Sequence, residues 1–211
     1  MAAFRLARRR RAPMVELDVH QTKDGRLVVI HDATLTRTTG CDGAVGRLPF
    51  SQLRRLDAGR WFSPRFAGEP IPTLEQALAS LGSRMAVNIE LKAGRYPGIE
   101  SHLIAVLDRL GWIERTLVSS FHPSRLARIR RVHRTVSVGI LVHPWSLSRA
   151  LERARRYGAV SIHPPVRVVT ARVVERIHRD GRLVLPYTVD RRTDQARLIR
   201  MGVDGYFTNQ P

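Results

Sequence analysis

The sequence contains little cysteine and no long apolar run. Cys41 is the only cysteine among the 211 residues, which excludes an internal disulfide. No stretch approaches the ~20 consecutive apolar residues that a membrane-spanning helix needs, so we expect no transmembrane segment. The opening residues MAAFRLARRRR carry cations with no apolar run behind them, unlike a secretory signal. The default expectation is therefore a cytoplasmic protein.

Lysine is also scarce, although the chain is strongly basic. The 36 basic residues outnumber the 18 acidic ones, which gives a formal net charge of +18, yet Lys23 and Lys92 are the only lysines. Clustered cations would indicate a nucleic-acid or anionic-membrane partner. Here the arginines are spread along amphipathic segments, which favours a compositional bias of the source. We expect no nucleic-acid partner, and a basic nucleic-acid binder is kept only as a third hypothesis.

Residues 14–32, MVELDVHQTKDGRLVVIHD, carry a dense set of reactive side chains. In a β-strand, residues two apart share a face, so Glu16 and Asp18 present two carboxylates side by side. The Asp-Gly dipeptide at 24–25 is a hairpin signal, which predicts that the chain folds back and brings His31 near this pair. On its own, such a carboxylate pair is more often a solvated strand edge than a metal site.

Helices and strands alternate from Thr73 onward, where Thr73 and Gln76 suit a helix capping box. Strands that are apolar on both faces and separated by amphipathic helices imply a parallel sheet covered by helices. The expected strands are 85–92, 116–121, 137–142, 159–164, 182–189 and 202–209, and the expected helices between them are 98–111, 123–132, 146–157, 168–180 and 192–201. Together with 14–19 these give seven βα strands, one fewer than a closed (β/α)8 barrel has.

We expect residues 1–211 to form a single domain. Residues 33–73 lack a clear period, and long loops within compact domains are usually functional insertions, so we interpret this segment as a cap over the site. Trp61, Phe62 and Phe66 indicate that the cap is packed rather than disordered.

Polar residues collect at the carboxyl ends of the expected strands, the face that carries the active site in barrel enzymes. Glu90 and Lys92 share a strand face, as the first carboxylate pair does. Three carboxylates at one barrel mouth would repel each other unless a hard divalent cation lay among them, and oxygen ligands favour Mg²⁺ or Ca²⁺ over Zn²⁺. His163 ends another strand, where a structural role and a substrate contact are equally expected. Phe121 lines the pocket or packs in the core, and the remaining histidines, including His20 and His143, are expected at the surface or in loops.

Five segments of the sequence are similar to the motifs of one known enzyme family. The family pattern E-x-D-V-x-x-T-x-D-G-x-x-V-x-x-H-D is present as ELDVHQTKDGRLVVIHD. RWFSPRFAGEPIPTLEQAL is similar to the family's insertion and following helix, NIELK to its third metal-ligand strand and VSSF to the next strand. YTVDRRTDQARLIRMGVDGYFTNQP is similar to the family's ending, W-T-V-N followed by G-V-D-G-I-x-T-D-x-P. The chain therefore resembles the glycerophosphodiester phosphodiesterase family, and the resemblance covers almost all of its length.

This resemblance implies a TIM (β/α)8-type barrel that hydrolyses glycerophosphodiesters to glycerol 3-phosphate and an alcohol, in glycerol and lipid metabolism. By position it implies a metal site, for Mg²⁺ or Ca²⁺, at Glu16, Asp18 and Glu90. It also implies acid–base work by His31, as one of two histidines, and stabilisation of phosphate charge by Lys92. Tyr187 replaces the family's usual tryptophan and keeps an aromatic wall on the substrate side.

Two family motifs are not found in the sequence. The first strand normally ends in H-R-G and is followed by P-E-N, which supply the second histidine and an arginine for the phosphate. We therefore expect a barrel whose first β-strand unit is absent or truncated. Losing one acid–base group costs about 10²–10⁴ in rate, and the missing strand leaves an open barrel edge that predicts self-association. The alternative is a catalytically impaired or inactive remnant that binds a phosphodiester or a partner without turnover.

Overall fold

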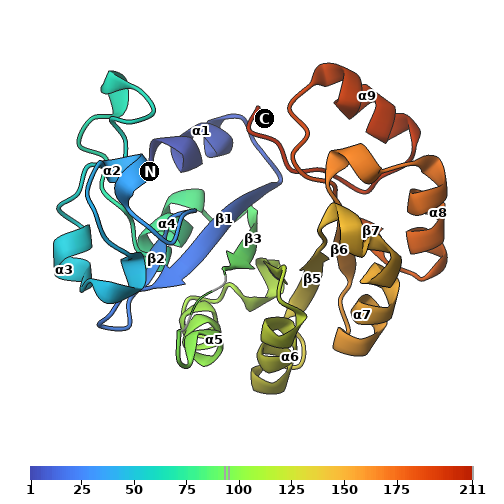
Figure 1. Ribbon diagram of the computed structural model, residues 1–211, viewed down its shortest axis with the longest axis horizontal. Coiled ribbons are helices and arrows are strands. Elements are labelled where there is room, and N and C mark those ends of the chain that lie inside the picture. The colour runs from blue at the N-terminus through green and yellow to red at the C-terminus, as the bar shows by residue number, and fades with distance from the viewer. Residues whose placement is uncertain (93, 95, 211) are drawn as a thin grey trace. The chain divides into compact units, whose positions relative to one another are not determined.

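The computed structural model describes residues 1–92, 94 and 96–210 (Figure 1). Contacts along the chain divide it into two compact units, Met1–Thr116 and Leu117–Pro211. The single domain expected over residues 1–211 stays a prediction.

The first unit is built around a hairpin and one parallel strand. Its elements are α1 (Ala2–Arg9), β1 (Met14–Gln21), β2 (Leu27–Val29), α2 (Thr36–Thr39), α3 (Phe50–Leu53), α4 (Leu74–Leu81), β3 (Ala86–Leu91) and α5 (Ile99–Arg109), with short 3-10 helices at Val45–Arg47, Pro64–Phe66 and Ile113–Arg115. The strand β2 pairs antiparallel with β1, which confirms the hairpin, and β3 pairs parallel with β1. The expected capping box is also confirmed, because the Thr73 hydroxyl accepts from the Gln76 N–H and the Gln76 side chain accepts from the Thr73 N–H.

Residues 33–73 pack against β2 through a small apolar core. Its buried members are Val28, Ile30, Leu35, Val45, Leu53 and Ile71. The segment is packed, as expected, but Trp61 and Phe62 are 49% and 71% exposed and are not buried members of its core. Aliphatic side chains fill this core instead, and the two aromatic rings contact each other edge to face at 5.8 Å. That the segment caps the site stays a prediction.

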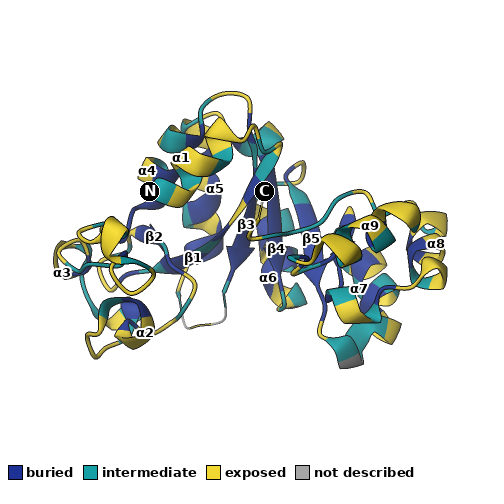
Figure 2. Cartoon of the chain, turned by 90° about the horizontal axis from the view of Figure 1, so that it is seen from above, coloured by how far each residue is buried: buried dark blue, intermediate teal, exposed yellow. Residues whose placement is uncertain are grey.

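The second unit alternates strands and helices, as the periodicity predicts. Its elements are β4 (Thr116–Ser120, beginning at the boundary), α6 (Pro123–Val132), β5 (Ser137–Leu141), α7 (Ala150–Tyr157), β6 (Ser161–His163), α8 (Ala171–Arg179), β7 (Leu183–Val184) and α9 (Arg192–Arg200), with 3-10 helices at Pro144–Arg149 and Val166–Val168. The strands lie in the order β4-β5-β6-β7, each parallel to its neighbour. Buried positions follow the strands, while the outer faces of helices such as α8 are exposed (Figure 2).

The strand expected at 202–209 is wrong, because no strand is assigned in this fully described segment. Its backbone still bonds to the chain after β7, with Asp204 N–H donating to Val184 O at 3.2 Å and Phe207 N–H donating to Pro186 O at 2.8 Å. Pro186 has no N–H to donate, so the regular ladder is interrupted there. β7 is also shorter than the expected 182–189, because Pro164 on the β6 side has no N–H to donate to Leu185 O in the parallel ladder.

The described pairings within the two units are parallel except for the hairpin, which confirms an α/β fold with a mostly parallel sheet. Among the described helices, none is long and apolar enough to cross a membrane.

Candidate metal centre and active site

Three carboxylates meet on β1 and β3 of the first unit. Glu16 and Asp18 share one face of β1, and the parallel register makes Glu90 on β3 the partner of Asp18. One oxygen from each of the three lies within 4.8 Å of the other two. Within the described part of the chain, this is the only group of three or more acidic, histidine or cysteine side chains that is close enough to hold a metal ion. The carboxylates that the sequence predicted are therefore brought together.

Lys92, just after β3, joins two of these carboxylates. Its Nζ lies 2.8 Å from Oδ1 of Asp18 and 2.8 Å from Oε1 of Glu90. Burial of the ammonium acts to lower the Lys92 pKa, but the two carboxylates outweigh it and the pKa is raised overall. Lys92 therefore carries a positive charge among the carboxylates.

The lysine does not neutralise the group completely. The pKa of Glu16 is raised well above its usual value by desolvation and by the charges of Asp18 and Glu90, which outweigh Lys92. The Glu16 side chain is still exposed to solvent, so its desolvation is partial. The charges of Asp18 and Glu90 raise its pKa as well. Burial likewise raises the pKa of Glu90, against the opposing effect of Lys92. The cluster has more negative charge than one ammonium can balance.

The hairpin brings His31 beside this cluster, as expected. Ile30 N–H donates to the Asp18 carbonyl at 3.1 Å, so the residue after β2 lies next to the carboxylate strand. The His31 side chain is 66% exposed, and its Nδ1 lies 2.6 Å from Oδ1 of Asp32. Asp32 also accepts from Arg37 Nε at 2.5 Å. His31 is thus accessible to a substrate and held on one side.

The surface position expected for His20 is wrong, because this residue is 1% exposed. Its Nδ1 lies 2.6 Å from the Tyr96 hydroxyl and its Nε2 lies 3.2 Å from the His31 carbonyl oxygen. Burial lowers its pKa. The signal that could have found it is the strand period, since His20 is two residues beyond Asp18 on the same face.

Two of the residues expected to contact substrate lie together in the second unit. The rings of Phe121 and Tyr187 meet edge to face at 5.9 Å, and the Tyr187 hydroxyl donates to Val142 O at 2.9 Å. His143, which the sequence analysis left among the surface histidines, stacks on Phe121 with ring centres 4.4 Å apart. The residues form an aromatic cluster, and its contact with substrate stays a prediction.

The third such residue, His163, is 0% exposed. Its Nε2 lies 2.8 Å from the Ser161 hydroxyl, and a Cβ at position 139 would approach that nitrogen to 2.7 Å, so Gly139 makes room for the ring. Burial lowers the pKa of His163 to about 3, which keeps the ring neutral. This geometry fits the structural role of His163 that the sequence left open, and a substrate contact stays a prediction.

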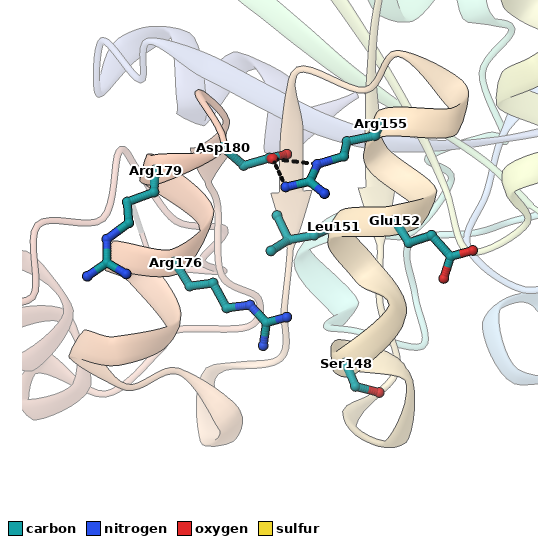
Figure 3. A pocket seen from close by; sticks show the side chains of 7 residues that line it. All are labelled: Ser148, Leu151, Glu152, Arg155, Arg176, Arg179 and Asp180. Carbon is teal, nitrogen blue, oxygen red and sulfur yellow. Dashed lines mark hydrogen bonds and ion pairs between the residues drawn. The ribbon is translucent and has the colours of Figure 1, made fainter.

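A cavity of about 330 Å³ lies elsewhere in the second unit, between α7 and α8 (Figure 3). Its lining consists of Ser148, Leu151, Glu152, Arg155, Arg176, Arg179 and Asp180. Arg155 Nε donates to Asp180 at 2.6 Å, and Arg179 is paired with Glu175 on its own helix. The cavity shares no residue with the carboxylate cluster, and within its lining Arg155 forms an ion pair with Asp180.

Known enzymes resemble this chain over its whole length. The family described as glycerophosphoryl diester phosphodiesterase matches residues 1–211. A glycerophosphodiester phosphodiesterase of Caldanaerobacter subterraneus subsp. tengcongensis is 39% identical, over 100% of this chain and 88% of the relative. A glycerophosphodiester phosphodiesterase of Bacillus subtilis is 33% identical, over 99% of this chain and 78% of the relative.

Solved structures agree with the sequence relatives. An Oleispira antarctica phosphodiesterase in complex with the product sn-glycerol-3-phosphate is similar with a TM-score of 0.91 and 29% identity, covering 100% of this chain and 86% of that one. A glycerophosphodiester phosphodiesterase from Agrobacterium tumefaciens has a TM-score of 0.83 and 28% identity, covering 98% and 87%. The carboxylate cluster therefore lies in a chain with the fold of these enzymes, and the chain belongs to the glycerophosphoryl diester phosphodiesterase family.

Proposed function

We propose that this protein hydrolyses glycerophosphodiesters to glycerol 3-phosphate and an alcohol, using a divalent metal ion. The observation that carries the proposal is the cluster of Glu16, Asp18 and Glu90, with Lys92 bonded to two of its members. The Oleispira phosphodiesterase, whose structure contains sn-glycerol-3-phosphate as product, supports the identity of the phosphate product.

The donor set fits Mg²⁺ or Ca²⁺. The three ligands offer only carboxylate oxygens, which hard divalent cations prefer. Desolvation is the main cause of the raised pKa values of Glu16 and Glu90, and the charge of Asp18 adds to it, so a bound cation would stabilise the ionised forms. When bound, such an ion supplies Lewis-acid polarisation of a phosphoryl oxygen.

Two side chains beside the cluster would act on the phosphodiester directly. The Lys92 ammonium is charged and lies at the carboxylates, where it would bind a phosphate oxygen as charge develops on it. His31 is engaged through Nδ1 with Asp32, which leaves Nε2 as the ring nitrogen for proton transfer. We also propose that Phe121 and Tyr187 contact the substrate.

The proposal is tested first by metal binding. Isothermal titration with Mg²⁺ and Ca²⁺ should show one bound ion for the parent chain and at least about tenfold weaker binding for Glu90→Gln, since removing a metal ligand's charge weakens the site. Glu114→Gln is the matched control, because Glu114 is exposed and lies outside the cluster. Equal metal affinity in the parent and a folded Glu90→Gln variant would contradict the assigned site.

Turnover is tested with glycerophosphocholine and glycerophosphoglycerol. We expect metal-dependent release of glycerol 3-phosphate that stops when a chelator removes the ion. Metal binding without release of glycerol 3-phosphate from either substrate would contradict hydrolysis and would favour the alternative of a binding protein without turnover.

A further inference from the structure

A row of contacts in the first unit runs from His31 to Trp61. Nδ1 of His31 lies 2.6 Å from Oδ1 of Asp32, and Arg37 Nε donates to Oδ2 of the same carboxylate at 2.5 Å. The Arg37 guanidinium carbon lies 4.7 Å from the centre of the Trp61 ring, within the range of a cation–π contact. Trp61 in turn donates from Nε1 to Ala58 O at 3.0 Å. Each oxygen of Asp32 therefore has its own partner.

The ionisation of Asp32 decides which nitrogen of a neutral His31 ring carries hydrogen. Hydrogen bonds from Arg37 and from His31 hold the pKa of Asp32 well below its usual range. An ionised carboxylate can only accept, so Nδ1 of His31 must be the donor. In the neutral ring the lone pair is then on Nε2, where it can take up a proton.

Arg37 acts on the direction of this carboxylate more than on stability. The side chains of His31, Asp32 and Arg37 are 66%, 23% and 48% exposed, and ion pairs this open to solvent contribute little to the free energy of unfolding. The Arg37 side chain makes two directed contacts, because its Nε donates to Asp32 and its guanidinium carbon lies over the Trp61 ring. It holds Oδ2 of Asp32, which leaves Oδ1 facing the histidine.

The main chain at His31 is held independently of this row. His20 Nε2 lies 3.2 Å from the His31 carbonyl oxygen, and Ile30 N–H donates to Asp18 O at 3.1 Å. The freedom left to His31 is the rotation of its ring and the choice of tautomer, and both depend on Asp32.

We propose that Asp32 and Arg37 are positioning residues for His31: Arg37 orients the Asp32 carboxylate, and Asp32 holds the imidazole in the Nδ1–H form. The use of Nε2 in hydrolysis rests on the proposed function, whereas the assignment of the tautomer does not. In the proton-transfer step, the O–H bond of the attacking hydroxyl breaks, an N–H bond forms at Nε2, and the resulting imidazolium lies against the ionised Asp32. The ring later returns that proton to the leaving oxygen or to water.

The tautomer can be read from the ¹⁵N shifts of the His31 ring in a long-range ¹H–¹⁵N spectrum of the full chain, at a pH where the ring is neutral. The His31→Gln spectrum assigns the signals. The parent should show a protonated Nδ1 and an unprotonated Nε2.

In Asp32→Asn, Arg37 retains its hydrogen bond to the amide oxygen, so the amide NH₂ faces Nδ1 and the ring hydrogen moves to Nε2. The kcat should fall about 100-fold, within the about 10²–10⁴ that a positioned acid or base contributes, with KM little changed.

Two changes at Arg37 separate positioning from folding. Arg37→Gln should give a mixture of the two tautomers and an intermediate kcat, and Arg37→Lys should partly restore the Nδ1–H form because a cation again faces Asp32. Arg54→Gln is the matched control, since Arg54 is an exposed arginine of the same unit outside this row. It should give the spectrum and the turnover of the parent.

An Nε2–H ring in the parent, or an unchanged Nδ1–H ring in a folded Asp32→Asn variant, would overturn the inference. If the tautomer changes as expected in Asp32→Asn but the parent chain shows no turnover, the positioning roles are supported and the proposed function is contradicted. The failure of the inference and the failure of the proposed function can therefore be told apart.

Discussion

The burial of His163 predicts a specific loss of stability in mild acid. The folded-state pKa is about 3, whereas the ordinary value is 6.5. Between these values the unfolded chain binds a proton that the folded chain does not, so the contribution to stability is complete above pH 6.5 and is lost as the pH falls toward 3. Replacing His163 with asparagine removes this titration and leaves Ser161 an amide partner.

The size of the effect follows from the two pKa values. At about 1.4 kcal/mol per pH unit, the full gap corresponds to about 5 kcal/mol as an upper limit. The part that falls between about pH 8 and pH 5 is about 2 kcal/mol, because only the unfolded state titrates in that interval. His163 has no exposed surface, so solvent screening does not reduce this figure.

Urea unfolding at about pH 8 and pH 5, followed by circular dichroism and tryptophan fluorescence, gives the free energy of unfolding at each pH. The measured effect is the difference between the parent and His163→Asn in how this free energy changes with pH. The parent should lose about 2 kcal/mol more than His163→Asn over this interval, although the variant is less stable at both pH values because of the cavity it creates. His122→Asn, at an exposed histidine of the same unit, should keep the pH dependence of the parent. Identical pH dependence in the parent and His163→Asn would refute the buried, neutral ring.

Three further outcomes test the first unit. Since the Glu16 pKa is raised and a metal ligand must be deprotonated, Mg²⁺ or Ca²⁺ affinity measured by titration calorimetry should fall as the pH is lowered from about 8 to 5, whereas a pH-independent affinity would contradict a role for Glu16. Lys92→Met should lower kcat by about 10²-fold or more in the glycerol 3-phosphate assay, as loss of a charge-stabilising donor does, and unchanged kcat would remove Lys92 from the phosphate site. Thr73→Ala should lower the free energy of unfolding by about 1 kcal/mol through loss of the capping box of α4. Thr193→Ala, at an exposed threonine on α9, is the control and should change the free energy of unfolding by less than about 0.5 kcal/mol.

Local signals in the sequence predicted most of the elements. The Asp-Gly turn, the capping box at Thr73 and the alternation of apolar strands with amphipathic helices all gave elements that the structure contains. The segment 202–209 failed for a non-local reason, because its partner strand contains Pro186, which cannot donate to a ladder. Periodicity uses only the residues of the segment itself, so it does not show which strand that segment pairs with.

The part of the site that lies on one strand face could be predicted from the two-residue period of a β-strand. Same-face spacing predicted Glu16 with Asp18, and the parallel register then brought in Glu90. The strand period places His20 on the face of Asp18, but its contact with Tyr96, which is 76 residues away, is not visible in the sequence. The exposure of Trp61 was missed for a similar reason, since the apolar core of the insertion is filled by residues from several separate segments.

The parallel pairing of β1 with β3 also limits how this protein can change its length. Side chains alternate between the two faces of a strand, so one residue inserted between Ala86 and Glu90 would turn Glu90 to the opposite face and remove it from Asp18. Residues 33–73 connect the same two strands without entering their ladder, and insertions there leave the register intact. We therefore expect a change of length to be tolerated in this segment away from Arg37 and Trp61, whereas the four residues before Glu90 must keep their number.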